Sequence, residues 1–150
     1  MNTCGEKIGV RMNRLIIIGD ADAIIAQTDP DDVHHQTATV ISDSLKSKDA
    51  QVIYPVTAIL EAATHMQRVL SSTASAYGTA VVFSDPNIQV IEVNQDTLRK
   101  AITYFNPDTS KKNTLFDCTV AAVAEKYKAD AIFSFDKFYK SKGFKLVSEL

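Results

Sequence analysis

The sequence lacks tryptophan and has only two cysteines, five glycines and four prolines among its 150 residues. Two cysteines make no disulfide framework, so a reducing, cytoplasmic location is expected. No apolar run approaches the ~20 residues of a membrane-spanning helix, and the N-terminus has no apolar signal-peptide core, so no membrane partner is expected. The glycine-rich motifs of dinucleotide and nucleoside triphosphate sites are missing too. These absences argue against a secreted disulfide scaffold, a membrane protein and the common nucleotide-binding classes.

What is present fits one globular domain. Apolar residues make up 45 % of the chain and charged residues 23 %, which is ordinary for such a domain. The 16 basic and 18 acidic residues nearly balance, although the stretch 136–145 holds four lysines and a single aspartate. We expect residues 1–11 to form a flexible N-terminal tail and residues 12–150 to form a single domain.

Apolar runs alternate with helical patterns along the chain. Within the segment 14–19, the run from Leu15 to Gly19 is apolar without alternation, which is typical of a strand buried on both faces. Asp29 and Pro30, a cap followed by a first-turn proline, predict the start of the second helix. Such alternation predicts an α/β fold with a parallel central sheet of about five strands and helices on both faces. The strands are expected at 14–19, 51–54, 88–93, 131–135 and 145–147, and the helices at 20–28, 29–45, 55–71, 74–83, 95–105 and 114–127.

Acidic residues stand where these strands end. Asp20 and Asp136 directly follow apolar strands. Asp117 lies in the first turn, and Glu61 in the second turn, of helices that start from the same edge. The carboxyl ends of parallel strands meet at one edge, where such folds bind ligands. Carboxylates crowded on one rim are costly unless cations neutralise them, and oxygen ligands suit Mg²⁺ or Mn²⁺. These residues therefore predict metal-dependent cleavage of a phosphate ester.

Each carboxylate also has a purely structural interpretation. Asp20 and Asp136 could cap the helices that follow them. Asp117 has capping-box spacing from Thr114. Glu61, inside its helix, could be a solvated surface residue. Spacing alone leaves both interpretations open.

At this point the chain resembles the PIN domain family, and within it the VapC-type toxin ribonucleases, over nearly its whole length. An apolar strand ending in Asp20 fits the first motif, with Asp22 in place of the usual small polar residue. Glu61, after a short strand, fits the helical glutamate. Asp117 opens an alanine-rich helix, and Asp136 follows a serine two residues earlier. The matching segments are 17–25, 30–35, 56–61, 116–122 and 132–138.

The resemblance implies a PIN-like sheet and an endoribonuclease that hydrolyses RNA phosphodiester bonds with one or two Mg²⁺ or Mn²⁺ ions. It further implies the toxin of a toxin–antitoxin pair, a homodimer held inactive by a cognate antitoxin. The catalytic and metal-binding residues would be Asp20, Glu61, Asp117 and Asp136.

Other residues receive supporting roles in this hypothesis. Asp22 and Ser134 are expected to assist the carboxylates. The substrate would be single-stranded or structured RNA, whose backbone attracts lysines. The candidate RNA-binding residues are Lys137, Lys140, Lys111 and Lys112.

Two rival functions are weighed against this one. The stretch from Gly19 to Asp22 also resembles the nucleophile motif of haloacid-dehalogenase-like phosphatases, in which Asp20 would attack phosphate. Alternatively, a PIN-like fold serves as a non-catalytic RNA- or protein-binding module.

The adjacent His34 and His35 are expected on a solvated helix face, because neighbours on a helix point about 100° apart and cannot easily share an ion.

Overall fold

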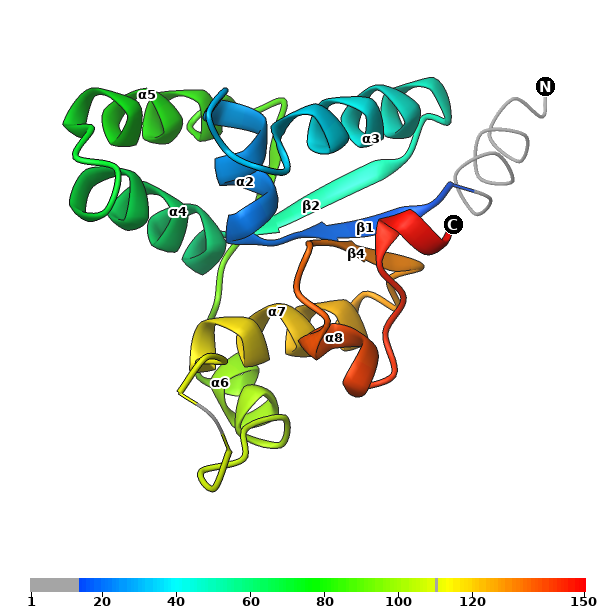
Figure 1. Ribbon diagram of the computed structural model, residues 1–150. Helices are drawn as coiled ribbons and strands as arrows, with labels where there is room; N and C mark the ends of the chain where they lie inside the picture. Colours follow the sequence, from blue (N-terminus) through cyan, green and yellow to red (C-terminus); the bar gives the residue numbers. More distant parts are fainter. Residues whose placement is uncertain (1–13, 110) are drawn as a thin grey trace, which may run out of the picture.

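The computed structural model describes residues 14–109 and 111–150 (Figure 1). The predicted tail at residues 1–11 lies outside the described residues. None of the described helices is long and apolar enough to cross a bilayer.

The centre of the fold is a parallel sheet of four strands. These strands are β1 (Ile16–Gly19), β2 (Gln51–Pro55), β3 (Gln89–Ile91) and β4 (Ala131–Phe133). Their order is β3-β2-β1-β4, and all neighbouring pairs are parallel. The predicted α/β class with a parallel central sheet is confirmed.

The central strand explains the lack of alternation in its sequence. Successive side chains of a strand point to opposite faces. Ile17 belongs to the apolar cluster on one face, with Ala38 and Leu45, whereas Ile18 belongs to the cluster on the other, with Val120. Both isoleucines are fully buried. Each face therefore requires an apolar residue, and β1 has a continuous apolar run.

Helices cover both faces of the sheet (Figure 1). On one side lie α2 (Ala21–Thr28) and α3 (His35–Ser47), and on the other lie α6 (Gln95–Ile102), α7 (Leu115–Lys126) and the short α8 (Phe138–Ser141). Helices α4 (Val56–Arg68) and α5 (Thr73–Phe83) pack on each other, and α4 also packs on α2 and α7. The first turns of α2 and α4 directly follow β1 and β2, so both helices begin at the carboxyl edge of the sheet.

The expected fifth strand at 145–147 is reduced to one parallel bridge between Ile132 and Leu146. The backbone N–H of Ile132 donates to Lys145, but the chain then turns into the 3-10 helix η1 (Val147–Glu149). The prediction of about five strands was thus one too high, because the chain leaves the sheet after a single pairing.

The second predicted helix also begins later than expected. Asp29 ends α2, donating its N–H to Ile25, and does not start a helix. Its side chain accepts from the N–H of Asp31, and the side chain of Asp32 accepts from His34. Such side-chain turns compete with helix formation. Pro30 consequently lies in a turn, and α3 starts only at His35.

Candidate active site

Asp20 is the most buried carboxylate at the carboxyl edge of the sheet. It follows β1, caps α2 and is only 3 % exposed. Its Oδ1 accepts from the N–H of Ala21 at 2.7 Å. Its Oδ2 accepts from Ser134 Oγ at 3.0 Å and from Tyr139 Oη at 2.7 Å. The capping interpretation is thus right as local geometry, but a cap alone needs neither this burial nor these distant donors.

Asp22 lies beside Asp20 and shares Ser134 with it. Asp22 Oδ2 accepts from Ser134 Oγ at 3.0 Å and from the N–H of Phe135 at 2.8 Å. Its Oδ1 is buried and has no hydrogen-bond partner within the described part of the chain. Ser134 has one hydroxyl proton and cannot fully satisfy both carboxylates at once. The pair Asp20–Asp22 is therefore short of donors.

Asp117 and Asp136 are connected by one side-chain amide. Asn113 Nδ2 lies 2.9 Å from Asp136 Oδ2 and 3.4 Å from Asp117 Oδ2. Asp117 also accepts from the N–H of Thr114 at 2.9 Å in the expected capping box. Asp136 Oδ1 accepts from the N–H of Phe138 at 2.9 Å. Both aspartates thus have local structural roles and also converge on the same amide.

Glu61 faces the aspartates from the second turn of α4. Burial and, to a smaller extent, the negative charges of Asp117 and Asp22 together raise its pKa to about 7. A glutamate on a solvated face would feel neither effect. The surface interpretation of Glu61 is therefore not what the structure shows.

Three aspartates are perturbed in the same way. Burial, followed by the charge of Asp22 and then that of Asp117, raises the pKa of Asp20 well above its usual value. Burial also raises the pKa values of Asp22 and Asp117, and the charge of Asp136 adds to both. The structure thus brings all five predicted acids into one interacting group, which we call the acidic cluster: Asp20, Asp22, Glu61, Asp117 and Asp136.

The donor chemistry of the acidic cluster fits a hard divalent cation. All of its candidate ligand atoms are carboxylate oxygens, which hard cations prefer. The buried Asp22 Oδ1 has no hydrogen-bond donor in the described residues, and a cation would fill that place. Across residues 14–109 and 111–150, however, no three such side chains are spaced as a formed metal site would hold them. The acidic cluster therefore has ligand atoms that suit a divalent cation, but among the described residues they are not arranged in the coordination geometry of a bound metal.

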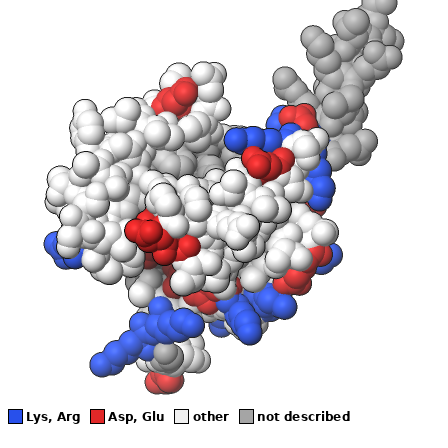
Figure 2. All heavy atoms as spheres, turned by 45° about the horizontal axis from the view of Figure 1, so that its top comes forward, with Lys and Arg blue, Asp and Glu red and all other residues white. Residues whose placement is uncertain are grey.

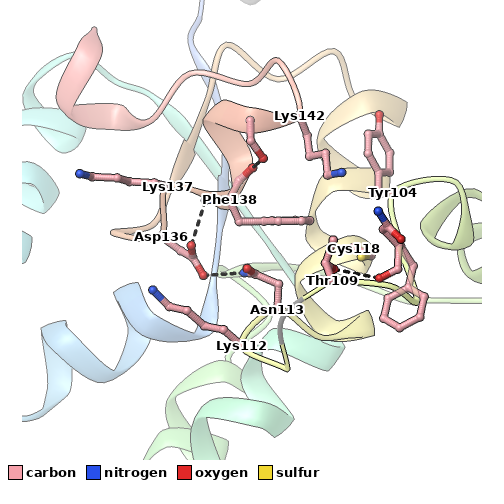
Figure 3. Close-up of a pocket in the computed structure, with 12 residues that line it drawn as sticks. Tyr104, Thr109, Lys112, Asn113, Cys118, Asp136, Lys137, Phe138 and Lys142 are labelled. Carbon is pink, nitrogen blue, oxygen red and sulfur yellow. Dashed lines mark hydrogen bonds between the residues drawn. The ribbon is translucent and has the colours of Figure 1, made fainter.

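The predicted lysines divide into two groups. Lys112 and Lys137 line a cavity beside Asp136 and Asn113 (Figure 3). Lys140 points elsewhere, because its Nζ lies 3.4 Å from Glu149. Lys111 is exposed and is not part of the cavity lining. In Figure 2, blue side chains gather along the lower part of the molecule, below a red group near its centre.

Sequence reasoning missed the side chains that hold the carboxylates in place. Tyr139 and Asn113 are polar donors, yet neither has a spacing that distinguishes it from an ordinary core or loop residue. Only the expectation that a buried carboxylate needs donors points toward them.

The histidines differ from expectation in part. His34 is exposed but is not on a helix face: it precedes α3, and its ring stacks on Phe135 with centroids 4.2 Å apart and planes 3° apart. The Nδ1 of His35 lies 2.7 Å from the carbonyl oxygen of Ala26. The two rings therefore have separate partners.

Comparisons with a protein-family profile and with a solved structure both support a PIN-like fold. The sequence profile described as PIN domain matches residues 17–145. The fold is similar to the crystal structure of VapC20 from Mycobacterium tuberculosis, described as a toxin that cleaves the sarcin–ricin loop. The TM-score is 0.74 at 21 % sequence identity, and the match covers 85 % of this chain and 95 % of that one. Curated protein sequences include no match. The profile match spans most of the chain and confirms the resemblance seen in the motifs: this chain belongs to the PIN domain family.

Proposed function

We propose that this protein is a divalent-metal-dependent endoribonuclease of the VapC type and the toxin of a toxin–antitoxin pair. The observation that carries the proposal is the acidic cluster, in which burial and the charges of carboxylates from separate segments raise the pKa values of Asp20, Glu61 and Asp117. If these carboxylates had only a structural role, their mutual repulsion would destabilise the fold without any benefit. A similar fold belongs to a toxin whose described activity is cleavage of the sarcin–ricin loop.

The proposed ligands of Mg²⁺ or Mn²⁺ are Asp20, Asp117 and Asp136, with Glu61 completing the set. A hard divalent cation supplies charge neutralisation to a scissile phosphate and acidity to water. Three side chains keep the ligands in position: Ser134 and Tyr139 donate to Asp20, and Asn113 donates to Asp136.

Glu61 has a second proposed role. Glu61 carries a carboxylate that can accept a proton, and in the metal-free protein burial and the charges of Asp117 and Asp22 raise its pKa to about 7. It sits in the second turn of α4 and is half-buried. We place it where it takes the proton of the attacking water. Asp22 would act on the ligands by its charge, since its Oδ2 shares Ser134 with Asp20.

The RNA backbone would be held by lysines beside the acidic cluster. Lys112 and Lys137 line the cavity that Asp136 also lines. Lys111 is adjacent and exposed. Lys140 is paired with Glu149, so we propose a smaller contribution to RNA binding for it than for Lys112 and Lys137. Single-stranded or structured RNA in the cytoplasm is the proposed substrate, because a flexible strand can enter this crowded edge of the sheet.

A phosphatase mechanism through Asp20 has less support, because the family model that matches residues 17–145 is that of the PIN domain. An aspartyl-phosphate trapped on Asp20 would favour the phosphatase, whereas internal cleavage of an oligoribonucleotide would exclude it. The experiment at the end of this section distinguishes the ribonuclease from the other alternative, a non-catalytic RNA- or protein-binding module.

Partner proteins have a proposed place on the surface. Over α4 and α5 the molecule shows few charged side chains (Figure 2). Large apolar side chains are exposed there. They are Leu60, Val69, Tyr77, Val81 and Val82. We place the homodimer contact on this face, and a cognate antitoxin would need to reach the acidic cluster at the sheet edge to block it.

The function is tested with end-labelled RNA titrated with Mn²⁺. Internal cleavage that requires the ion, and that is lost in Asp20→Asn and Asp117→Asn, is the expected result. Asp43→Asn, on the exposed surface of α3, is the matched control and should cleave as the wild type does. Binding of RNA without ion-dependent cleavage would favour the non-catalytic module instead.

A further inference from the structure

A cavity of about 410 Å³ opens next to the acidic cluster (Figure 3). It lies between the end of α6, the loop before α7 and helix α8. Asp136 and Asn113, which belong to or contact the acidic cluster, form part of its wall. This volume is at the lower end of the range for small-molecule sites and suits one nucleoside rather than a folded partner.

Aromatic rings and lysines line this cavity together. Phe138, Tyr104 and Phe105 contribute rings, and Phe105 is 40 % exposed. Tyr104 is fixed from behind, because its hydroxyl donates to Glu125 at 2.7 Å. Exposed rings beside a phosphate-cleaving site are platforms on which a nucleobase stacks.

Lys142 gives the cavity a hydrogen-bond donor. Its Nζ lies 5.6 Å from the centroid of the Phe138 ring, and its side chain is half-buried. Figure 3 shows this amine pointing into the space between Phe138 and Tyr104. An ammonium group donates only, so it favours a base edge made of acceptors, and the O6 and N7 atoms of guanine form such an edge.

The position of the cavity sets which nucleotide would enter it. Lys137 and Lys112 also line it, and their positive charge complements a phosphate. Asp136 is shared between the acidic cluster and the cavity. A strand whose scissile phosphate lies at the acidic cluster would therefore place an adjacent base against Phe138.

We infer that this cavity binds one unpaired nucleobase of the RNA, next to the scissile phosphate, and favours guanine through Lys142 and Phe138. The inference rests on the proposed ribonuclease function and deepens it, because it names a determinant of cleavage specificity.

The first experiment measures binding without cleavage. The full chain, in EDTA, is titrated with each of the four ribonucleoside 5′-monophosphates and followed by NMR. Guanosine monophosphate is expected to bind most tightly and to shift signals of the cavity residues. Lys142→Gln and Phe138→Leu should each weaken this binding about fivefold or more. Phe138→Leu keeps the backbone N–H that donates to Asp136. The matched controls are Lys48→Gln, after α3, and Phe116→Leu, on α7, which should bind as the wild type does.

The second experiment measures base preference in cleavage. Oligoribonucleotides that vary at the positions around the cut are digested with Mn²⁺ by the wild type and by the same variants. Lys142→Gln is expected to reduce the preference for guanine beside the cut about fivefold or more, and Lys48→Gln to keep it.

The two proposals fail in different ways. Cleavage with unchanged base preference in both cavity variants, and no mononucleotide signal in the cavity, would overturn the base site and leave the ribonuclease standing. Guanosine monophosphate in the cavity of a protein that cleaves no RNA would overturn the ribonuclease and leave a nucleotide site.

Discussion

The hydroxyl of Tyr139 lies 2.7 Å from Oδ2 of Asp20, although 119 residues separate the two in sequence. Both side chains are buried, Tyr139 completely. Tyr139 belongs to the four-residue helix α8, whereas Asp20 lies directly after the central strand β1. One hydrogen bond therefore fixes the C-terminal segment against the acidic cluster.

Replacing Tyr139 by Phe tests this hydrogen bond. The change leaves the buried ring and removes the only proton that Tyr139 offers. Loss of a buried hydrogen bond to a carboxylate costs about 1–3 kcal/mol. We expect the free energy of unfolding to fall by that amount in urea denaturation, together with slower RNA cleavage. Tyr77→Phe, at a site where the ring is 73 % exposed, is the control. An unchanged unfolding free energy in Tyr139→Phe would show that the contact is not made.

The acidic cluster sets the pH dependence of stability without metal. Glu61 titrates at 4.5 in the unfolded chain and at about 7 in the folded one, so the folded state binds more protons. Stability should therefore fall as pH rises from about 4.5 to about 7. Asp20, Asp22 and Asp117 act in the same direction, since their pKa values are also raised. Thermal unfolding in EDTA across this window measures the effect, and Glu61→Gln should flatten it. Stability that rises over the same window would contradict the arrangement of the cluster.

Removing one negative charge should relieve the cluster when metal is absent. In Asp22→Asn the side-chain oxygen can still accept from Phe135, while the charge that raises the pKa values of Asp20 and Glu61 disappears. We expect the metal-free variant to melt at the same temperature as the wild type or a few degrees higher, about 2–4 °C per kcal/mol. Addition of Mn²⁺ should raise its melting temperature less than it raises that of the wild type. A clear fall in the melting temperature of the metal-free variant would mean that Asp22 is mainly structural.

Two neighbouring lysines make a matched pair for RNA binding. Lys137 lines the cavity beside Asp136, whereas Lys140 is engaged with Glu149. Lys137→Gln should weaken binding of RNA in EDTA and reduce the slope of log affinity against log salt by about 1. Lys140→Gln should leave both quantities close to those of the wild type. Fluorescence anisotropy over a salt series measures both, and equal effects of the two changes would remove Lys137 from the proposed path.

The main features of the fold were predictable from sequence because the responsible signals are local. The unbroken apolar run before Asp20 indicated a strand buried on both faces, and parallel pairing then placed the terminal carboxylates on one edge. The turn after Asp29 was not predicted, because the side-chain hydrogen bonds that form it compete with a helix start of similar composition. Tyr139 and Asn113 were not predicted as site residues either, since only the folded chain brings them to the carboxylates.

The single hydroxyl of Ser134 between Asp20 and Asp22 has a thermodynamic consequence. Burial and mutual repulsion raise the pKa values of both carboxylates, so an arriving cation must expel any proton that the pair holds. Ion uptake by this protein should thus acidify an unbuffered solution. Calorimetry in buffers of different ionisation enthalpy should then report different heats for the same association, and the slope counts the protons released.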